Sequence, residues 1–182
     1  MTRNTSPRDW CSAGLTILRD EGLEALTVDR LCMAVGRTKG SFYHHFRELD
    51  SYLSALLTHW EEELTEALIR DSAPEPDTFQ REVRIEGLAR LLDHQLDRAV
   101  RAWAMRDARA RVAMERVDKR RIAFIAEIFQ ERGYRDPHLL AELKYMAFVG
   151  AQQIGVFESP ARAARLTETL RSALAWLGNQ EG

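Results

Sequence analysis

A ten-residue segment of the chain, RTKGSFYHHF from Arg37 to Phe46, combines side chains that suit contact with DNA. Residues 37–47 carry Arg37, Lys39 and Arg47 but no acidic residue. Lysine and arginine bind phosphates, whereas serine, tyrosine and histidine can hydrogen-bond either phosphates or the edges of bases. The formal net charge of the whole chain is -2, so affinity for a polyanion would have to come from a local surface such as this one.

A helix that begins near Thr38 would divide this segment into two faces. Phe42 and Phe46 fall on one face, where they would dock the helix onto its neighbours, and most of the polar side chains fall on the other. Gly40 lies on the polar face, although a glycine in a helix costs about 0.8–1 kcal/mol relative to alanine. Its benefit there would be room for a phosphate or a base to approach the backbone. The alternative is a short amphipathic helix whose polar face is simply solvated, but the run of residues as a whole favours DNA.

Two helices before this one are predicted from apolar periodicity and from capping residues. The first runs from about Pro7 to Asp20 and is ended by Gly22. Thr27 is a good N-cap for a short second helix, which Gly36 ends. A pair of short helices joined at a glycine is typical of the helix-turn-helix motif, whose second helix enters the major groove of DNA.

The remainder of the chain also predicts helices, so the fold is expected to be all-α with about nine helices. No long stretch alternates apolar and polar residues as a strand would. A long fourth helix is expected from about Asp50, and the segment SAPEPD, residues 72–77, is the clearest linker. Five further helices are expected at about residues 78–92, 96–106, 109–132, 138–157 and 161–177.

The sequence also argues against several functional classes. The chain of 182 residues has two cysteines, no N-terminal apolar signal segment and no apolar run near the ~18–20 residues that span a bilayer, so we expect a cytoplasmic protein without a membrane partner. We find no catalytic triad, phosphate loop, dinucleotide motif or metal-ligand set. His44 and His45 are adjacent, so a helix turns them about 100° apart and they would poorly share a metal. We therefore expect that the protein is not an enzyme and that it binds neither a metal ion nor a cofactor.

From Gly22 to Leu57 the sequence GLEALTVDRLCMAVGRTKGSFYHHFRELDSYLSALL resembles the DNA-binding signature of the TetR family of one-component transcriptional regulators. The close resemblance covers about residues 8–57 and implies a homodimer in which each subunit places its third helix in the major groove. Carried over by position, it implies DNA contacts from Thr27, Thr38, Lys39, Gly40, Ser41, Tyr43 and His44. Arg37 stands where the family usually has an apolar residue, and it would either snorkel or add a phosphate contact. Leu49 stands where many members have a lysine that would contact a phosphate.

The same resemblance implies a functional division of the chain. Residues 1–48 would form a three-helix helix-turn-helix DNA-binding domain, and residues 49–182 a helical domain that binds a small-molecule effector and forms the dimer. Pockets for such molecules are mostly apolar with a few polar groups. The candidate effector-binding residues are Trp60, Trp103, Met105, Phe124, Tyr145, Phe148 and Gln152. Ordinary core packing is the alternative for each of them.

The dimer is also predicted from the last two helices. The segment from Leu139 to Phe157 is apolar nearly all round after Tyr145, and Gly150, Ala151 and Gly155 would let a neighbouring helix approach closely. The final helix repeats apolar residues with heptad-like spacing, at Ala163, Leu166, Leu170, Ala173, Leu174 and Leu177. The alternative is that both helices complete the core of a monomer.

These features together predict a ligand-responsive, homodimeric repressor that a small-molecule effector releases from a palindromic operator in double-stranded DNA. Effector binding would change the separation of the two DNA-reading helices, which must meet half-sites about one DNA turn apart. The alternative function is a dimeric helical adaptor that binds proteins and no operator.

Overall fold

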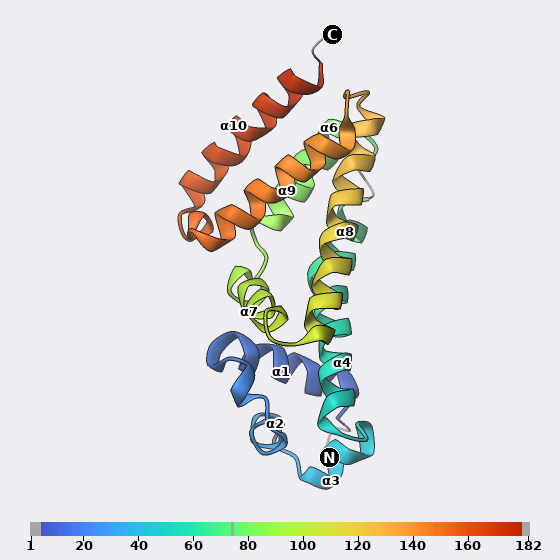
Figure 1. The fold of residues 1–182 in the computed structure, drawn as a ribbon, viewed down its shortest axis with the longest axis vertical. Helices are drawn as coiled ribbons and strands as arrows, with labels where there is room; N and C mark the ends of the chain where they lie inside the picture. Colours follow the sequence, from blue (N-terminus) through green and yellow to red (C-terminus); the bar gives the residue numbers. More distant parts are fainter. Residues whose placement is uncertain (1–4, 74, 180–182) are drawn as a thin grey trace. The chain divides into compact units, whose positions relative to one another are not determined.

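The computed structural model describes residues 5–73 and 75–179, and the fold of these residues is all-α, as predicted (Figure 1). The α-helices are α1 (Pro7–Glu21), α2 (Val28–Val35), α3 (Lys39–His45), α4 (Leu49–Glu61), α5 (Ala67–Ser72), α6 (Thr78–Ala89), α7 (His94–Ala104), α8 (Ala108–Glu131), α9 (Pro137–Gln153) and α10 (Pro160–Gly178). A π-helical segment, Glu62–Glu66, joins α4 to α5, so these two helices correspond to the single long helix expected from Asp50. Counted in this way, the described residues contain the nine predicted helices.

The contacts between residues divide the chain into two compact units. Unit 1 contains the described residues up to Glu63 together with Gln95–Glu115. Unit 2 contains Leu64–His94 and the described residues from Arg116 onward. The division predicted after residue 48 is a functional one, and it stays a prediction.

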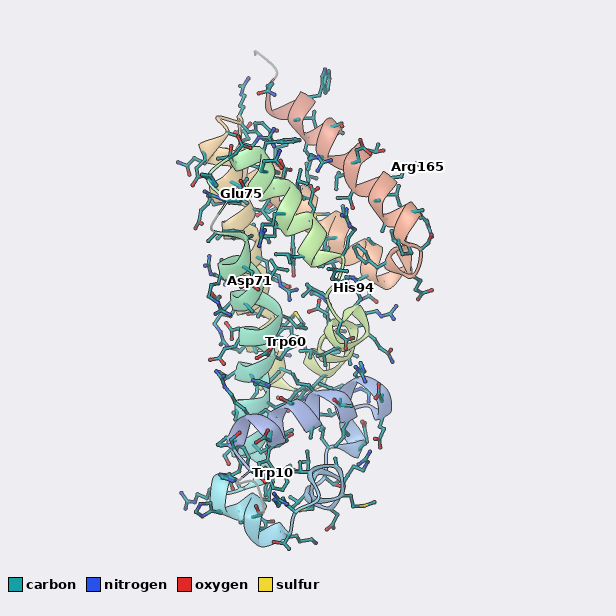
Figure 2. All side chains as sticks on the ribbon, turned by 180° about the vertical axis from the view of Figure 1, so that it is seen from behind. Trp10, Trp60, Asp71, Glu75, His94 and Arg165 are labelled. Atoms are coloured by element: carbon teal, nitrogen blue, oxygen red, sulfur yellow. The ribbon has the colours of Figure 1, made fainter. Side chains whose placement is uncertain are left out.

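The core of unit 1 receives at least one completely buried side chain from each of the first four helices. Trp10 of α1, Leu31 of α2, Phe42 of α3 and Tyr52 of α4 are all 0% exposed. Trp60, near the end of α4, is equally buried and is labelled with Trp10 in Figure 2. Burial of a large apolar side chain contributes about 1.5–3 kcal/mol, so these residues fix the short helices α2 and α3 to the longer α1 and α4.

Unit 2 is held together by an apolar cluster and by a buried ionic network. The cluster combines residues of α5, α8, α9 and α10 with Tyr134, and its largest members include Phe124, Phe129, Leu140 and Leu174. Tyr134 packs on the ring of Phe129, with their centroids 5.1 Å apart.

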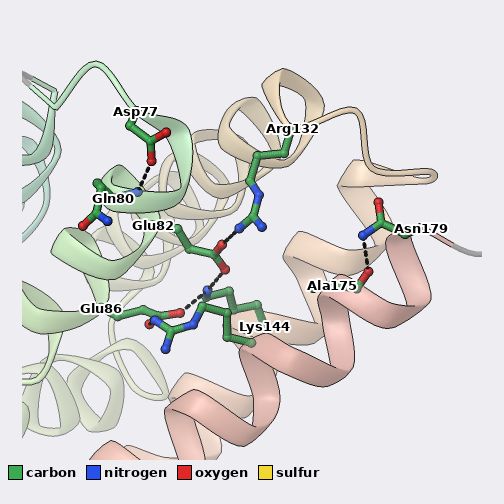
Figure 3. Close-up of polar contacts among 9 residues, drawn as sticks. Asp77, Gln80, Glu82, Glu86, Arg132, Lys144, Ala175 and Asn179 are labelled. Carbon is green, nitrogen blue, oxygen red and sulfur yellow. Dashed lines mark hydrogen bonds and ion pairs between the residues drawn. The ribbon is translucent and has the colours of Figure 1, made fainter.

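The ionic network joins α6 to the helices that follow it (Figure 3). Glu82 and Glu86 of α6 are buried, and Lys144 Nζ of α9 lies 2.5 Å from the Oε1 atom of each. Arg132 binds the other carboxylate oxygen of Glu82, and Arg171 of α10 lies 2.7 Å from the other oxygen of Glu86. Each carboxylate oxygen therefore has a cationic donor, which is the condition under which buried charges are tolerated.

The last two helices differ from the prediction in detail. α9 ends at Gln153, before the predicted end near residue 157, and Gly155 lies in the turn that follows with a positive φ of 68°. Gly155 is therefore a turn residue and not a site for close helix packing, because only glycine adopts this conformation without strain. In α10, Ala163 and Leu174 are buried within unit 2, whereas Leu166 and Leu177 are exposed.

Candidate nucleic-acid interface

The turn between α2 and α3 is built by the capping residues that the sequence predicts. Thr27 Oγ1 accepts a hydrogen bond from the backbone N–H of Arg30 at the start of α2, at 3.2 Å. Gly36 ends α2 with a left-handed backbone, at φ 67° and ψ 41°. Thr38 then caps α3, because its Oγ1 accepts a bond from Ser41 N–H at 3.4 Å. The caps fix where α3 begins, and hence which of its side chains turn outward.

The inward face of α3 is anchored by aromatic packing. The ring of Phe42 meets Trp10 edge to face, with ring centroids 5.4 Å apart and an interplanar angle of 79°. Phe46 meets the ring of Tyr52 in the same way at 5.1 Å and 82°. The Tyr52 hydroxyl donates a hydrogen bond to the carbonyl oxygen of Trp10 at 3.0 Å, and burial raises the pKa of this phenol. These contacts hold a seven-residue helix that would not be stable by itself.

The outward face of α3 presents the predicted DNA-contacting side chains to solvent. Lys39, Gly40 and His44 are exposed, and Tyr43 retains 53% of its surface. Ser41 is partly buried, and Thr38, before the helix, is exposed. The structure therefore brings together the predicted contacts of α3 on one accessible surface, which we call the α3 face: Thr38, Lys39, Gly40, Ser41, Tyr43 and His44.

Gly40 has open space on the side where a side chain would be. A Cβ atom built there would meet only Thr38 Oγ1, at an ordinary contact distance of 3.7 Å. Packing within the protein therefore gives no reason for a glycine at this position. The open space is what a close approach by another molecule would require.

Lys39 is paired with an acidic residue that the sequence analysis did not include in the site. Its ammonium lies 2.7 Å from Oδ1 of Asp29, at the start of α2, and both side chains are largely exposed. The hydrogen bond to Asp29 raises the pKa of Lys39, so the lysine stays charged. One sequence feature indicates this pair. Asp29 lies in the first turn of α2 and Lys39 in the first turn of α3, and a helix-turn-helix motif brings these two helices together.

Arg37 and Thr27 lie at the margin of the α3 face. Arg37 is partly buried, and its guanidinium donates to Thr5 Oγ1 at 2.6 Å and to the carbonyl oxygen of Gly36 at 3.2 Å. It is thus bonded to the turn and to the segment before α1. Thr27 is exposed at the start of α2 while its hydroxyl oxygen caps that helix. Arg47, which follows α3, is exposed.

The sequence of this region matches a known family. Residues 11–49 match the family described as bacterial regulatory proteins, tetR family. The matched range includes α2, the turn at Gly36 and all of α3. This part of the chain is a TetR-family domain.

Solved structures share the fold over nearly the whole chain. A transcriptional regulator from Rhodococcus sp. Rha1 superimposes with a TM-score of 0.76 at 17% identity, covering 95% of this chain and 96% of that one. A transcriptional regulator from Saccharomonospora viridis, in complex with choline, gives 0.76 at 14% identity, with 93% and 95% covered. The fatty acid degradation regulator FadR from Bacillus halodurans gives 0.72 at 16% identity, with 98% and 99% covered. Identities this low establish the fold alone.

The TetR-family domain supports a role in DNA-binding transcriptional regulation. Among curated proteins no sequence match is found. Regulators of this family are generally not enzymes.

No group of three or more His, Cys, Asp or Glu side chains within residues 5–73 and 75–179 is arranged to hold a metal ion. Every helix in this part of the chain is too short or too polar to cross a membrane.

Beyond the TetR-family domain, unit 2 contains a cavity of about 600 Å³. Its wall is formed by residues of α5, α6, α8, α9 and α10 and of the segments next to them. Most of the lining side chains are aliphatic or aromatic, and four are charged: Glu86, Arg90, Arg121 and Lys144. This combination of an apolar wall with a few polar groups is typical of small-molecule sites.

The structure separates the predicted effector-binding residues into two groups. Phe124, Tyr145 and Phe148 line the cavity of unit 2. Gln152 is also in unit 2 but does not line the cavity. It is buried, and its amide nitrogen lies 3.2 Å from Nδ1 of His94. The remaining three belong to unit 1 and do not line this cavity: Trp60, Trp103 and Met105.

The three residues of unit 1 have ordinary structural environments. Trp60 is 0% and Trp103 2% exposed, which is the core packing that the sequence left open as the alternative. Met105 is 82% exposed, just after α7. Apolar periodicity identifies the buried face of a helix, but it does not distinguish a residue packed in a core from one that lines a cavity. The predicted effector-binding residues therefore include residues of both units.

The walls that α6 and α10 contribute to the cavity contain none of the predicted effector-binding residues. Ile85 and Ala89 of α6 and Leu166 and Leu170 of α10 line it, together with Arg90 at the end of α6. The predicted residues carry mainly aromatic rings or an amide, whereas these wall residues are mainly aliphatic. The sequence signal for the α10 wall is its aliphatic stripe, which the sequence favours as a dimer contact, with the core of a monomer as the alternative.

Proposed function

We propose that this protein is a homodimeric, ligand-responsive transcriptional repressor that binds a palindromic operator in double-stranded DNA. The observation that carries the proposal is the α3 face, because a short helix anchored by Phe42 and Phe46 presents Lys39, Tyr43 and His44 to solvent. Lysine would bind phosphate, and tyrosine and histidine can hydrogen-bond phosphates or base edges. The match of residues 11–49 to the TetR family supports this assignment.

The dimer is supported by apolar side chains that α9 and α10 leave exposed. On α9, Leu139, Leu143 and Met146 follow helical spacing and are 56%, 40% and 66% exposed. On α10, Trp176 and Leu177 are 64% and 45% exposed. Soluble monomers rarely leave so many large apolar side chains uncovered on two neighbouring helices. A second copy of the chain would cover them, and two helices from each subunit would form a four-helix interface.

The two-fold symmetry of such a dimer would present two α3 faces to DNA. Dimeric helix-turn-helix proteins bind half-sites about one helical turn, roughly 34–36 Å, apart. The dimer could adopt conformations that differ in the distance between the two α3 faces. A ligand that prefers one of these conformations would change the affinity of the dimer for DNA, and DNA would change its affinity for the ligand by the same factor. The cavity of unit 2 is the candidate site for the small-molecule effector. The protein would act in the cytoplasm, where it meets its operator.

The experiment that tests this function is a binding screen with DNA from upstream of the protein's own gene and its neighbouring genes. We expect one palindromic fragment to bind with an affinity that falls steeply as salt rises, because phosphate contacts release counterions. A dimeric adaptor that binds proteins would show no such preference for one fragment. Equal, weak binding to every fragment would contradict the proposed operator recognition.

A further inference from the structure

The charged residues of the unit 2 cavity are unequal in sign. Arg90, Arg121 and Lys144 are cationic, and Glu86 is the one acidic residue among the described side chains of the wall. The remainder of the wall is almost wholly apolar. A ligand that enters this cavity therefore meets an apolar surface with an excess of positive charge, and this excess favours an anion over a cation.

The acidic residue of the wall is already neutralised by its neighbours. Oε1 of Glu86 lies 2.5 Å from Lys144 Nζ, and Oε2 lies 2.7 Å from a guanidinium nitrogen of Arg171. Both carboxylate oxygens thus have cationic partners, and Figure 3 labels the one from α9, Lys144. A cationic ligand would have to break one of these ion pairs to reach the carboxylate, and removing one partner from a buried pair is strongly destabilising.

Two of the three cations are likewise committed to protein groups. Lys144 is shared between Glu82 and Glu86, at 2.5 Å from each. Arg121 is buried and donates from Nε to Thr65 Oγ1 at 3.0 Å, with weaker bonds at 3.4 Å to the Tyr145 hydroxyl and to a backbone carbonyl. Both side chains serve as fixed parts of the wall.

Arg90 is different from the other charged residues of the wall. It is partly buried at the end of α6, and among the described residues its guanidinium has neither an ion pair nor a hydrogen bond. Its backbone carbonyl lies 3.3 Å from Nε2 of His94, whose ring stacks on Phe157 of the cavity wall at 4.0 Å. The backbone of Arg90 is therefore linked through His94 to the aromatic part of the wall at Phe157.

We propose that the cavity binds an amphipathic carboxylate, whose apolar body fills the cavity and whose carboxylate pairs with Arg90. This inference rests on the proposed ligand response and names the chemical class of the effector. The planar guanidinium matches a carboxylate in two parallel hydrogen bonds, which are stronger than bonds between neutral groups. Phe148 and Phe157, with ring centroids 5.5 Å apart, provide apolar surface for the body of the ligand.

Three probes that share one alkyl chain test the proposal by titration calorimetry: decanoate, decanol and decyltrimethylammonium. We expect decanoate to bind about tenfold more tightly than decanol, which corresponds to one charge-assisted contact. Arg90→Ala should abolish this preference and leave decanol binding unchanged, whereas Arg90→Lys should keep part of it. Arg135→Ala removes an exposed arginine of unit 2 outside the cavity wall and should have no effect.

Operator binding is measured on the same preparations without any probe. Failure of the proposed ligand site can therefore be distinguished from failure of the proposed function. If operator DNA binds and none of the probes does, or the ammonium probe binds most tightly, the inference is overturned and DNA binding stands. Decanoate binding that Arg90→Ala leaves unchanged also overturns it. If decanoate binds through Arg90 and no operator DNA binds, the site is supported and the proposed function fails.

Discussion

The ammonium of Lys39 lies 2.7 Å from the carboxylate of Asp29, so an acid of α2 shares the cation that α3 would present to phosphate. Both side chains are largely exposed, which makes the pair easy to exchange for another partner. Bound DNA would therefore compete with Asp29 for this lysine. The pair lowers the positive charge of the α3 face in the free protein.

Asp29→Asn should increase the affinity for operator DNA, because Lys39 would then meet phosphate without first leaving an acid. We expect a gain of about two- to fivefold, which is the range of an exposed ion pair. Fluorescence anisotropy with labelled operator DNA measures it. Asp20→Asn is the matched control, since Asp20 pairs with its neighbour Arg19 in α1. An affinity that Asp29→Asn leaves unchanged or weakens would contradict this role.

Gly40→Ala should separate the stability of the domain from its binding to DNA. An added Cβ meets no close neighbour, so thermal unfolding should show a gain of up to about 0.8–1 kcal/mol in the free energy of unfolding. Affinity for operator DNA should fall in the same variant, because the methyl group occupies the space through which the backbone is approached. A stabilised variant with unchanged affinity would show that the glycine does not serve DNA binding.

Met146→Arg should dissociate the proposed dimer without unfolding the subunit. Met146 is 66% exposed on α9, so a charged side chain fits there in the subunit alone but is buried in a four-helix interface. Sedimentation analysis should show a change from dimer to monomer, with helix content preserved. Gln130→Arg, at an exposed position of α8, is the control. A Met146→Arg protein that stays dimeric would place the interface elsewhere.

Asp107 should make the stability of unit 1 depend on pH. The hydrogen bond from Arg109 lowers its pKa to about 2, and the same guanidinium lies 2.9 Å from Asp50 at the start of α4. Because the pKa is lower in the folded state, the contribution is complete above about pH 4 and is lost as the pH falls toward 2. Asp107→Asn should therefore cost at most about 2 kcal/mol at pH 7 and much less near pH 2. Urea unfolding of both proteins at the two pH values measures this difference, and an equal cost at both would contradict it.

The helix-turn-helix could be predicted from sequence because local chemistry determines it. Thr27 and Thr38 cap their helices and Gly36 takes the left-handed conformation, so these three residues were enough to locate both helices. The two faces of α3 also followed from helical periodicity, with Phe42 buried and Tyr43 exposed. These features depend on interactions within a few residues of each position.

The rest of the fold depends on contacts that no local pattern reveals. The π-helical segment after α4 and the early end of α9 interrupt stretches whose apolar periodicity continues. Trp60 and Phe124 share a residue class and a helical context, yet one lies in the core of unit 1 and the other lines the cavity of unit 2. The Lys39–Asp29 pair and the uncommitted charge of Arg90 likewise required the positions of neighbouring helices.

The most direct test of the central claim is operator binding by Lys39→Ala and Tyr43→Ala, measured together with the mass of each protein in solution. Both side chains are exposed on the α3 face, so neither substitution should alter folding or dimerisation. Lys119→Ala, at an exposed lysine of α8, is the matched control. We predict that both α3 variants remain dimers and lose operator binding, while the control binds as the unaltered protein does. Dimers of Lys39→Ala and Tyr43→Ala that bind the operator with unchanged affinity would show that α3 does not read DNA.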